Sequence, residues 1–68
     1  MTIDLTINGE IRQVTEGQTL AGLLDDLNVN RQQVAVEVNE ELVPRESHKA
    51  HALASGDRIE IVTLVGGG

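Results

Sequence analysis

The chain has 68 residues, neither cysteine nor aromatic side chains, and a net charge of −6 from 11 acidic and 5 basic residues. This length allows one small domain, and the lack of cysteine excludes disulfides, thiolate metal sites and cysteine nucleophiles. The acidic balance and the missing stacking platforms argue against nucleic-acid binding and favour a protein partner with a basic docking surface.

The first strand is predicted at residues 2–7, where alternation places Ile3, Leu5 and Ile7 on one face. Asn8-Gly9 then signals a hairpin. A two-residue loop would turn Ile11 of the next strand outward, whereas a bulged three-residue loop would pair Ile7 with Ile11 and turn Val14 outward. We predict the bulged hairpin.

A helix is predicted to follow, with Thr19 as N-cap and Asn28 closing it in a left-handed conformation. Asp25 and Asp26 diverge on the helix surface, so we expect solvated side chains and no catalytic carboxylate pair. The core side of the helix is a narrow leucine stripe: Leu20, Leu23, Leu24 and Leu27.

Alternation predicts a third strand at residues 33–38, with its valines on one face and Ala35 and Glu37 on the other. A short strand at Leu42-Val43 should end at Pro44. Residues 47–53 are expected to form a short helical turn, and residues 55–57 a tight turn.

The last strand should run from Arg58 to about Val65, with Ile59 and Ile61 facing the core. The whole order predicts an α+β roll at residues 1–65, with one helix packed across a mixed four- to five-stranded sheet. A flexible glycine tail at residues 66–68 would follow it.

The three final glycines present an α-carboxylate on a chain without side chains, which suits entry into a narrow channel of another protein. Three residues reach roughly 10 Å. The alternative is an ordinary frayed terminus. We therefore treat Gly66, Gly67 and Gly68 as candidate functional residues.

Val62 and Leu64, with Ala35, are predicted to form an apolar docking strip on the helix-free face. The alternative is a bulge that turns Val62 and Leu64 inward. His48 and His51 share a spacing that suits a metal, but no further ligand is evident, so we predict solvent-exposed histidines and no metal site. The N-terminus lacks a basic leader and no apolar run reaches membrane-spanning length, so a cytoplasmic location without membrane contact is expected.

Several segments together carry a family resemblance: Asn8-Gly9-Glu10, Gly17-Gln18-Thr19-Leu20 with Leu23-Leu24, residues 34–39, Leu42-Val43-Pro44-Arg45, residues 55–62 and Gly67-Gly68. On these segments the chain resembles the ubiquitin-like β-grasp sulfur carriers, and most closely the ThiS family of thiamin biosynthesis. Gly66 departs from the usual glycine pair and would alter only the reach of the tail.

The resemblance implies that an E1-like adenylyltransferase uses Mg-ATP to adenylate the Gly68 carboxylate. A persulfide sulfur donor would then replace AMP, and thiazole synthase would receive sulfur from the resulting thiocarboxylate. The chain would be a carrier and not an enzyme, a monomer when free, with no cofactor of its own.

The alternatives are a carrier for molybdopterin synthesis, a modifier of protein lysines and a noncovalent adaptor. Molybdopterin carriers are usually longer and carry aromatic residues. A modifier with Lys49 as its sole lysine could build one kind of self-linked polymer.

Overall fold

The computed structural model describes residues 1–64. The last strand ends at Thr63, two residues before the predicted end at about Val65. The predicted glycine tail at residues 66–68 lies outside the described residues. The boundary of the predicted domain at residue 65 is therefore untested.

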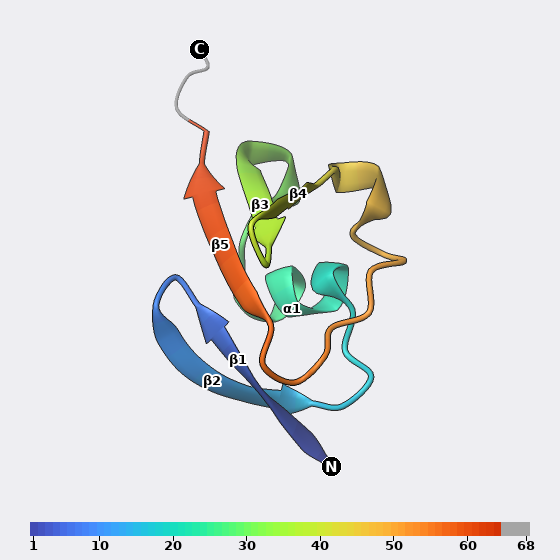
Figure 1. The fold of residues 1–68 in the computed structure, drawn as a ribbon. Helices are drawn as coiled ribbons and strands as arrows, with labels where there is room; N and C mark the ends of the chain where they lie inside the picture. Colours follow the sequence, from blue (N-terminus) through green and yellow to red (C-terminus); the bar gives the residue numbers. More distant parts are fainter. Residues whose placement is uncertain (65–68) are drawn as a thin grey trace.

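Within residues 1–64, five strands form one mixed sheet in the order β2-β1-β5-β3-β4 (Figure 1). Only β1 and β5 are parallel among these neighbours. One α-helix, α1 (Leu20–Asp26), lies across one face, and two 3₁₀ turns, η1 (Arg31–Gln33) and η2 (Arg45–Ser47), join the elements. This arrangement confirms the predicted α+β architecture. The strands are β1 (Thr2–Ile7), β2 (Glu10–Thr15), β3 (Val34–Val38), β4 (Glu41–Val43) and β5 (Arg58–Thr63).

The first hairpin has a two-residue loop, so the predicted bulge is wrong. Ile7 pairs with Glu10, and Ile11 is 77% exposed on the helix-free face. Both loop residues have positive φ, +48° at Asn8 and +84° at Gly9. This conformation matches the twist of the flanking strands, and the asparagine–glycine pair adopts it at low cost. Val14 consequently faces the core and is partly buried.

The helix α1 is capped at both ends, as predicted. The Thr19 hydroxyl oxygen accepts a hydrogen bond from the Gly22 amide at 3.1 Å. At the other end Asn28 has φ +59°, its amide donates to Asp25 O at 3.0 Å, and the Val29 amide donates to Leu24 O at 2.9 Å. These two bonds form a Schellman motif, which ends the helix and satisfies its last carbonyls.

The core lies between α1 and the inward side chains of the sheet. Leu27, at the helix end, is only partly buried against this cluster. The predicted leucine stripe and alternating valines are therefore confirmed as core. The most completely buried apolar side chains are Leu5, Leu20, Leu23, Leu24, Val36 and Ile59.

The predicted helical turn at residues 47–53 is misplaced, because the 3₁₀ turn η2 ends at Ser47. Two carbonyls of the 47–53 segment accept hydrogen bonds from the first turn of α1 instead of continuing the helical turn. His48 O accepts from the Ala21 amide at 3.0 Å, and His51 O accepts from the Leu20 amide at 2.9 Å. The segment thus stabilises the start of α1 by pairing amides that have no partner inside the helix.

Candidate docking face and carrier end

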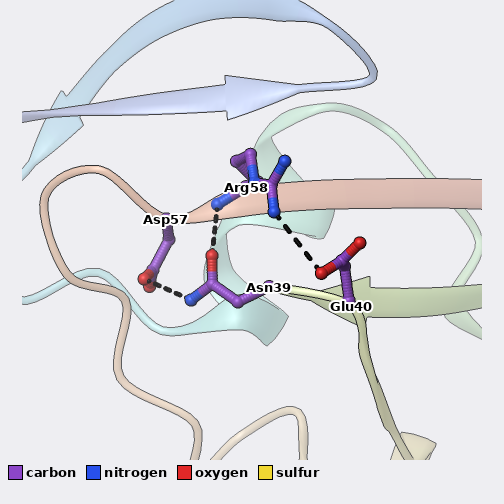
Figure 2. A network of polar contacts seen from close by, with 4 residues as sticks. All are labelled: Asn39, Glu40, Asp57 and Arg58. Carbon is purple, nitrogen blue, oxygen red and sulfur yellow. Dashed lines mark hydrogen bonds and ion pairs between the residues drawn. The ribbon is translucent and has the colours of Figure 1, made fainter.

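Strand β5 is held at its start by the turn between β3 and β4, as Figure 2 shows. The Asn39 side chain accepts from the Arg58 amide at 2.9 Å and donates to the Asp57 carboxylate at 2.9 Å. The Arg58 guanidinium lies 3.7 Å from Glu40, but both side chains are well exposed, 61% and 84%. Such a solvated ion pair contributes little to stability. The hydrogen bonds of the Asn39 side chain therefore fix this end of β5.

On the β1 side, Asn8 extends the strand pairing past the end of β1. Its amide donates to Ile59 O at 2.8 Å. Its side-chain oxygen accepts from the Ile61 amide at 2.7 Å, and its side-chain nitrogen donates to Ile61 O at 3.3 Å. The side chain thereby bonds to β5 as the backbone of a further strand residue would.

The helix-free face of the sheet exposes apolar side chains near the end of β5. Val62 is 59% exposed and lies opposite Ala35, which is half-buried. Leu64 is 56% exposed, and its amide donates to Gln33 O at 2.8 Å, which keeps it beside β3. The β3–β5 register has no bulge from Ile59 to Thr63. The predicted outward direction of Val62 is therefore confirmed, and the inward alternative is wrong for this strand.

Leu42 belongs to the same surface and was missed by the sequence reasoning. It is 65% exposed in β4 and pairs with Glu37, which lies two residues from Ala35 on the same face of β3. The signal was present in the alternation of the short strand, because a buried Val43 requires an outward Leu42. We define the apolar strip as Ala35, Leu42, Val62 and Leu64.

Two glutamates face each other beside the apolar strip. Glu37 of β3 and Glu60 of β5 are direct cross-strand partners, and both are exposed. Among residues 1–64 the ion pair found is that of Arg58 with Glu40, so neither member of this pair has a basic partner within 4.0 Å. We call Glu37 and Glu60 the glutamate pair.

The prediction of two solvent-exposed histidines is wrong for His48, which is 1% exposed. Its Nε2 lies 3.1 Å from Val43 O, and since a carbonyl only accepts, Nε2 carries the proton of this bond. Its Nδ1 is buried and has no hydrogen-bond partner among residues 1–64. The carbonyls of His48 and His51 hold this segment against the start of α1, and the His48 side chain is buried there with its bond to Val43 O.

In the described part of the chain, no group of three histidine, cysteine, aspartate or glutamate side chains is placed to hold a metal ion. The same residues contain no helix long and apolar enough to cross a membrane. The features that remain for function are the apolar strip, the glutamate pair and the sequence that follows β5.

A family model described as the ThiS family matches residues 5–68. The chain belongs to the ThiS family. The crystal structure of the thiamine biosynthesis protein ThiS from Geobacter metallireducens is similar, with a TM-score of 0.84 and 35% identity over 97% of this chain and all of that one. The predicted β-grasp fold of one helix across a mixed sheet is thus confirmed by a ThiS structure.

Among curated ThiS-like sequences, the chain is 30% identical to the sulfur carrier protein ThiS of Escherichia coli, over 97% of this chain and 100% of that protein. It is 45% identical to a thiazole synthase of Paramagnetospirillum magneticum over 94% of this chain. That match covers 20% of the thiazole synthase, so the chain spans about a fifth of this relative's length.

Proposed function

We propose that this chain carries sulfur as a thiocarboxylate on Gly68 for thiazole formation in thiamin biosynthesis. The observation that carries the proposal is the ThiS family match, which continues from the β-grasp domain through the final glycines. The full-length similarity to a sulfur carrier and the partial similarity to a thiazole synthase support the same pathway. In this proposal the free protein is a cytoplasmic monomer that binds neither nucleic acid nor membrane.

The chemistry must begin with activation, because a carboxylate is a poor electrophile. An E1-like adenylyltransferase, which binds the ATP and Mg²⁺, joins the Gly68 carboxylate to AMP and releases pyrophosphate. The terminal sulfur of a persulfide donor attacks the acyl carbon, AMP leaves, and an acyl disulfide results. A thiol then cleaves the disulfide bond, is itself oxidised to a disulfide, and leaves the thiocarboxylate on Gly68.

The chain supplies the acyl group and a docking surface, and the catalytic groups belong to its partners. Three glycines reach roughly 10 Å, so a partner that holds Gly68 in its active site must sit close to the end of β5. The apolar strip lies at that end, since Val62 and Leu64 are exposed and Leu64 is the last described residue. We propose that the adenylyltransferase and thiazole synthase contact this strip.

The test is the intact mass of the protein after co-expression with an E1-like adenylyltransferase and a persulfide donor. The expected product gains the mass difference between sulfur and oxygen, and a chain lacking Gly68 gains nothing. Supplying the loaded protein to thiazole synthase, together with the substrates that accept the sulfur, should then return the original mass. A mass that corresponds to a lysine conjugate would indicate a protein modifier, and an unchanged wild-type mass would contradict the carrier proposal.

A further inference from the structure

The hydrogen bonds between β3 and β5 use every second residue of β5. The Asn39 amide donates to Arg58 O at 2.7 Å, and the Leu64 amide donates to Gln33 O at 2.8 Å. These two bonds lie at either end of the antiparallel pairing, and bonded pairs alternate with non-bonded pairs between them. The even-numbered residues of β5 therefore bond to β3, and the odd-numbered residues point their amides and carbonyls to the opposite side.

The opposite side of β5 is paired only as far as Asn8. Ile59 O accepts from the Asn8 amide at 2.8 Å, and the Ile61 amide donates to the Asn8 side-chain oxygen at 2.7 Å. Thr63 is the next odd-numbered residue, but the chain has by then turned into β2, and β5 runs on past the hairpin (Figure 1). Within residues 1–64, the Thr63 amide and carbonyl thus point to a side of β5 on which no strand continues.

A hollow borders this open strand edge on the side of the sheet that carries α1. Its volume is about 320 Å³, and Thr63 is one of the residues that line it. Exposed polar residues of the β1–β2 hairpin form part of the lining. The apolar walls are the aliphatic side chains of Ile7, Leu27, Val29 and Ile61.

We infer that an extended segment of thiazole synthase adds to β5 at Thr63 as a further strand and places an aliphatic side chain in the hollow. A strand that adds to a sheet edge gains main-chain hydrogen bonds, and its alternate side chains reach pockets on one face. The open edge and the hollow supply these two contacts side by side. The inference rests on the proposed function, since it takes thiazole synthase as the docked protein.

The reach of the tail requires that the protein which takes sulfur from Gly68 covers the end of β5. Four residues follow Leu64, up to and including Gly68, and they span at most about 14 Å. The similarity to the thiazole synthase of Paramagnetospirillum magneticum then favours the synthase as the occupant. In that relative, a segment 45% identical to this chain and a thiazole synthase are parts of one protein.

Thr63→Pro tests the main-chain contact. Proline lacks the amide that the added strand would bond, and a strand tolerates it where this amide does not face a neighbouring strand. The free variant should therefore melt close to the wild type. The Kd of the full-length chain for purified thiazole synthase, measured by calorimetry, should rise about tenfold. Thr63→Val keeps the amide, and its Kd should stay within about twofold.

Val29→Phe tests the hollow without changing β5 or the tail. The larger side chain would occupy the hollow, while the Val29 amide keeps its bond to Leu24 O at 2.9 Å. The Kd for thiazole synthase should rise about tenfold or more, because the entering side chain is excluded. Val29→Ile adds a single methylene and should change the Kd by less than about threefold.

Hydrogen exchange of individual amides detects the added strand directly. In the free protein the Thr63 amide should exchange faster than the bonded amides of Ile61 and Leu64. Saturating thiazole synthase should slow exchange at Thr63. Unchanged exchange at Thr63 in the complex would overturn the inference, since the amide would then have gained no partner.

Sulfur loading by the adenylyltransferase separates this inference from the proposed function. Thr63→Pro and Val29→Phe should both be loaded as the wild type is. Normal synthase binding by both variants would overturn the inference alone. Equal losses of loading and of synthase binding would also overturn it, because the contact would not be specific to thiazole synthase. Failure of the wild type to be loaded or to bind the synthase would overturn the proposed function and the inference together.

Discussion

Val62→Asp tests whether the end of β5 presents a docking surface. Val62 is 59% exposed, so aspartate can stay in water in the free protein. The cost to folding is then the lower strand preference of aspartate, about 1 kcal/mol, with a few tenths more from the nearby glutamate pair. For a domain of this size 1 kcal/mol lowers Tm by roughly 4 to 8 °C. A partner that covers the strip must desolvate the carboxylate, which costs about 1 to 3 kcal/mol and weakens binding by about 5- to 150-fold.

The assay combines thermal unfolding of the free protein with pyrophosphate exchange catalysed by the adenylyltransferase. Val36→Asp places the same group on the buried face, where Val36 is 0% exposed, and should prevent folding. Ile11→Asp places it on the exposed face two strands away and should keep both fold and exchange. If Val62→Asp unfolds as Val36→Asp does, the face assignment is wrong. If it folds and supports exchange as Ile11→Asp does, the strip is not a docking surface.

Three further substitutions test the fold by chemical or thermal unfolding. Leu24→Ala should lower the free energy of unfolding by about 2 to 5 kcal/mol, because Leu24 is 0% exposed. This loss is a large part of the total free energy of unfolding, roughly 3 to 10 kcal/mol, that is expected for a chain of this length. A loss below about 0.5 kcal/mol would contradict the core assignment. Glu40→Gly should stabilise the protein by about 0.5 to 1 kcal/mol, since Glu40 has φ +71° in a two-residue turn and glycine adopts this conformation without strain. A destabilised variant would show that the backbone at Glu40 is not strained. His48→Ala should lower the free energy of unfolding by more than about 1 kcal/mol, because the hydrogen bond to Val43 O is lost. His51 is partly exposed, so His51→Ala should cost less than about 0.5 kcal/mol. Equal losses would contradict the distinction between a buried His48 and a partly exposed His51.

The predictable parts of the fold depend on signals contained within a few neighbouring residues. The alternation of valines in β3, the leucine spacing of α1 and the capping residues Thr19 and Asn28 each act locally, and all were placed correctly. The outward direction of Val62 follows from the same alternation, once the buried Ile59 fixes the phase of β5.

The errors occurred where distant segments decide the local conformation. The hairpin register depends on whether Ile11 or Val14 finds room against α1, and alternation alone does not distinguish the two. His48 is buried because its segment crosses to the start of α1, a contact with Ala21 from 27 positions earlier in the chain. The glutamate pair was equally hidden, since only the β3–β5 register brings Glu37 opposite Glu60.

The position of β5 explains how one strand can carry both the proposed docking surface and the proposed reactive end. It pairs with β1 and β3, and the side chains of Asn8 and Asn39 bond to its backbone from opposite sides. A slip of one residue would turn Val62 and Glu60 toward the core and Ile59 toward solvent. The two asparagines therefore help to set the exposed face without forming part of it. Because a tail of three glycines reaches only roughly 10 Å, the same register also limits where Gly68 can be delivered.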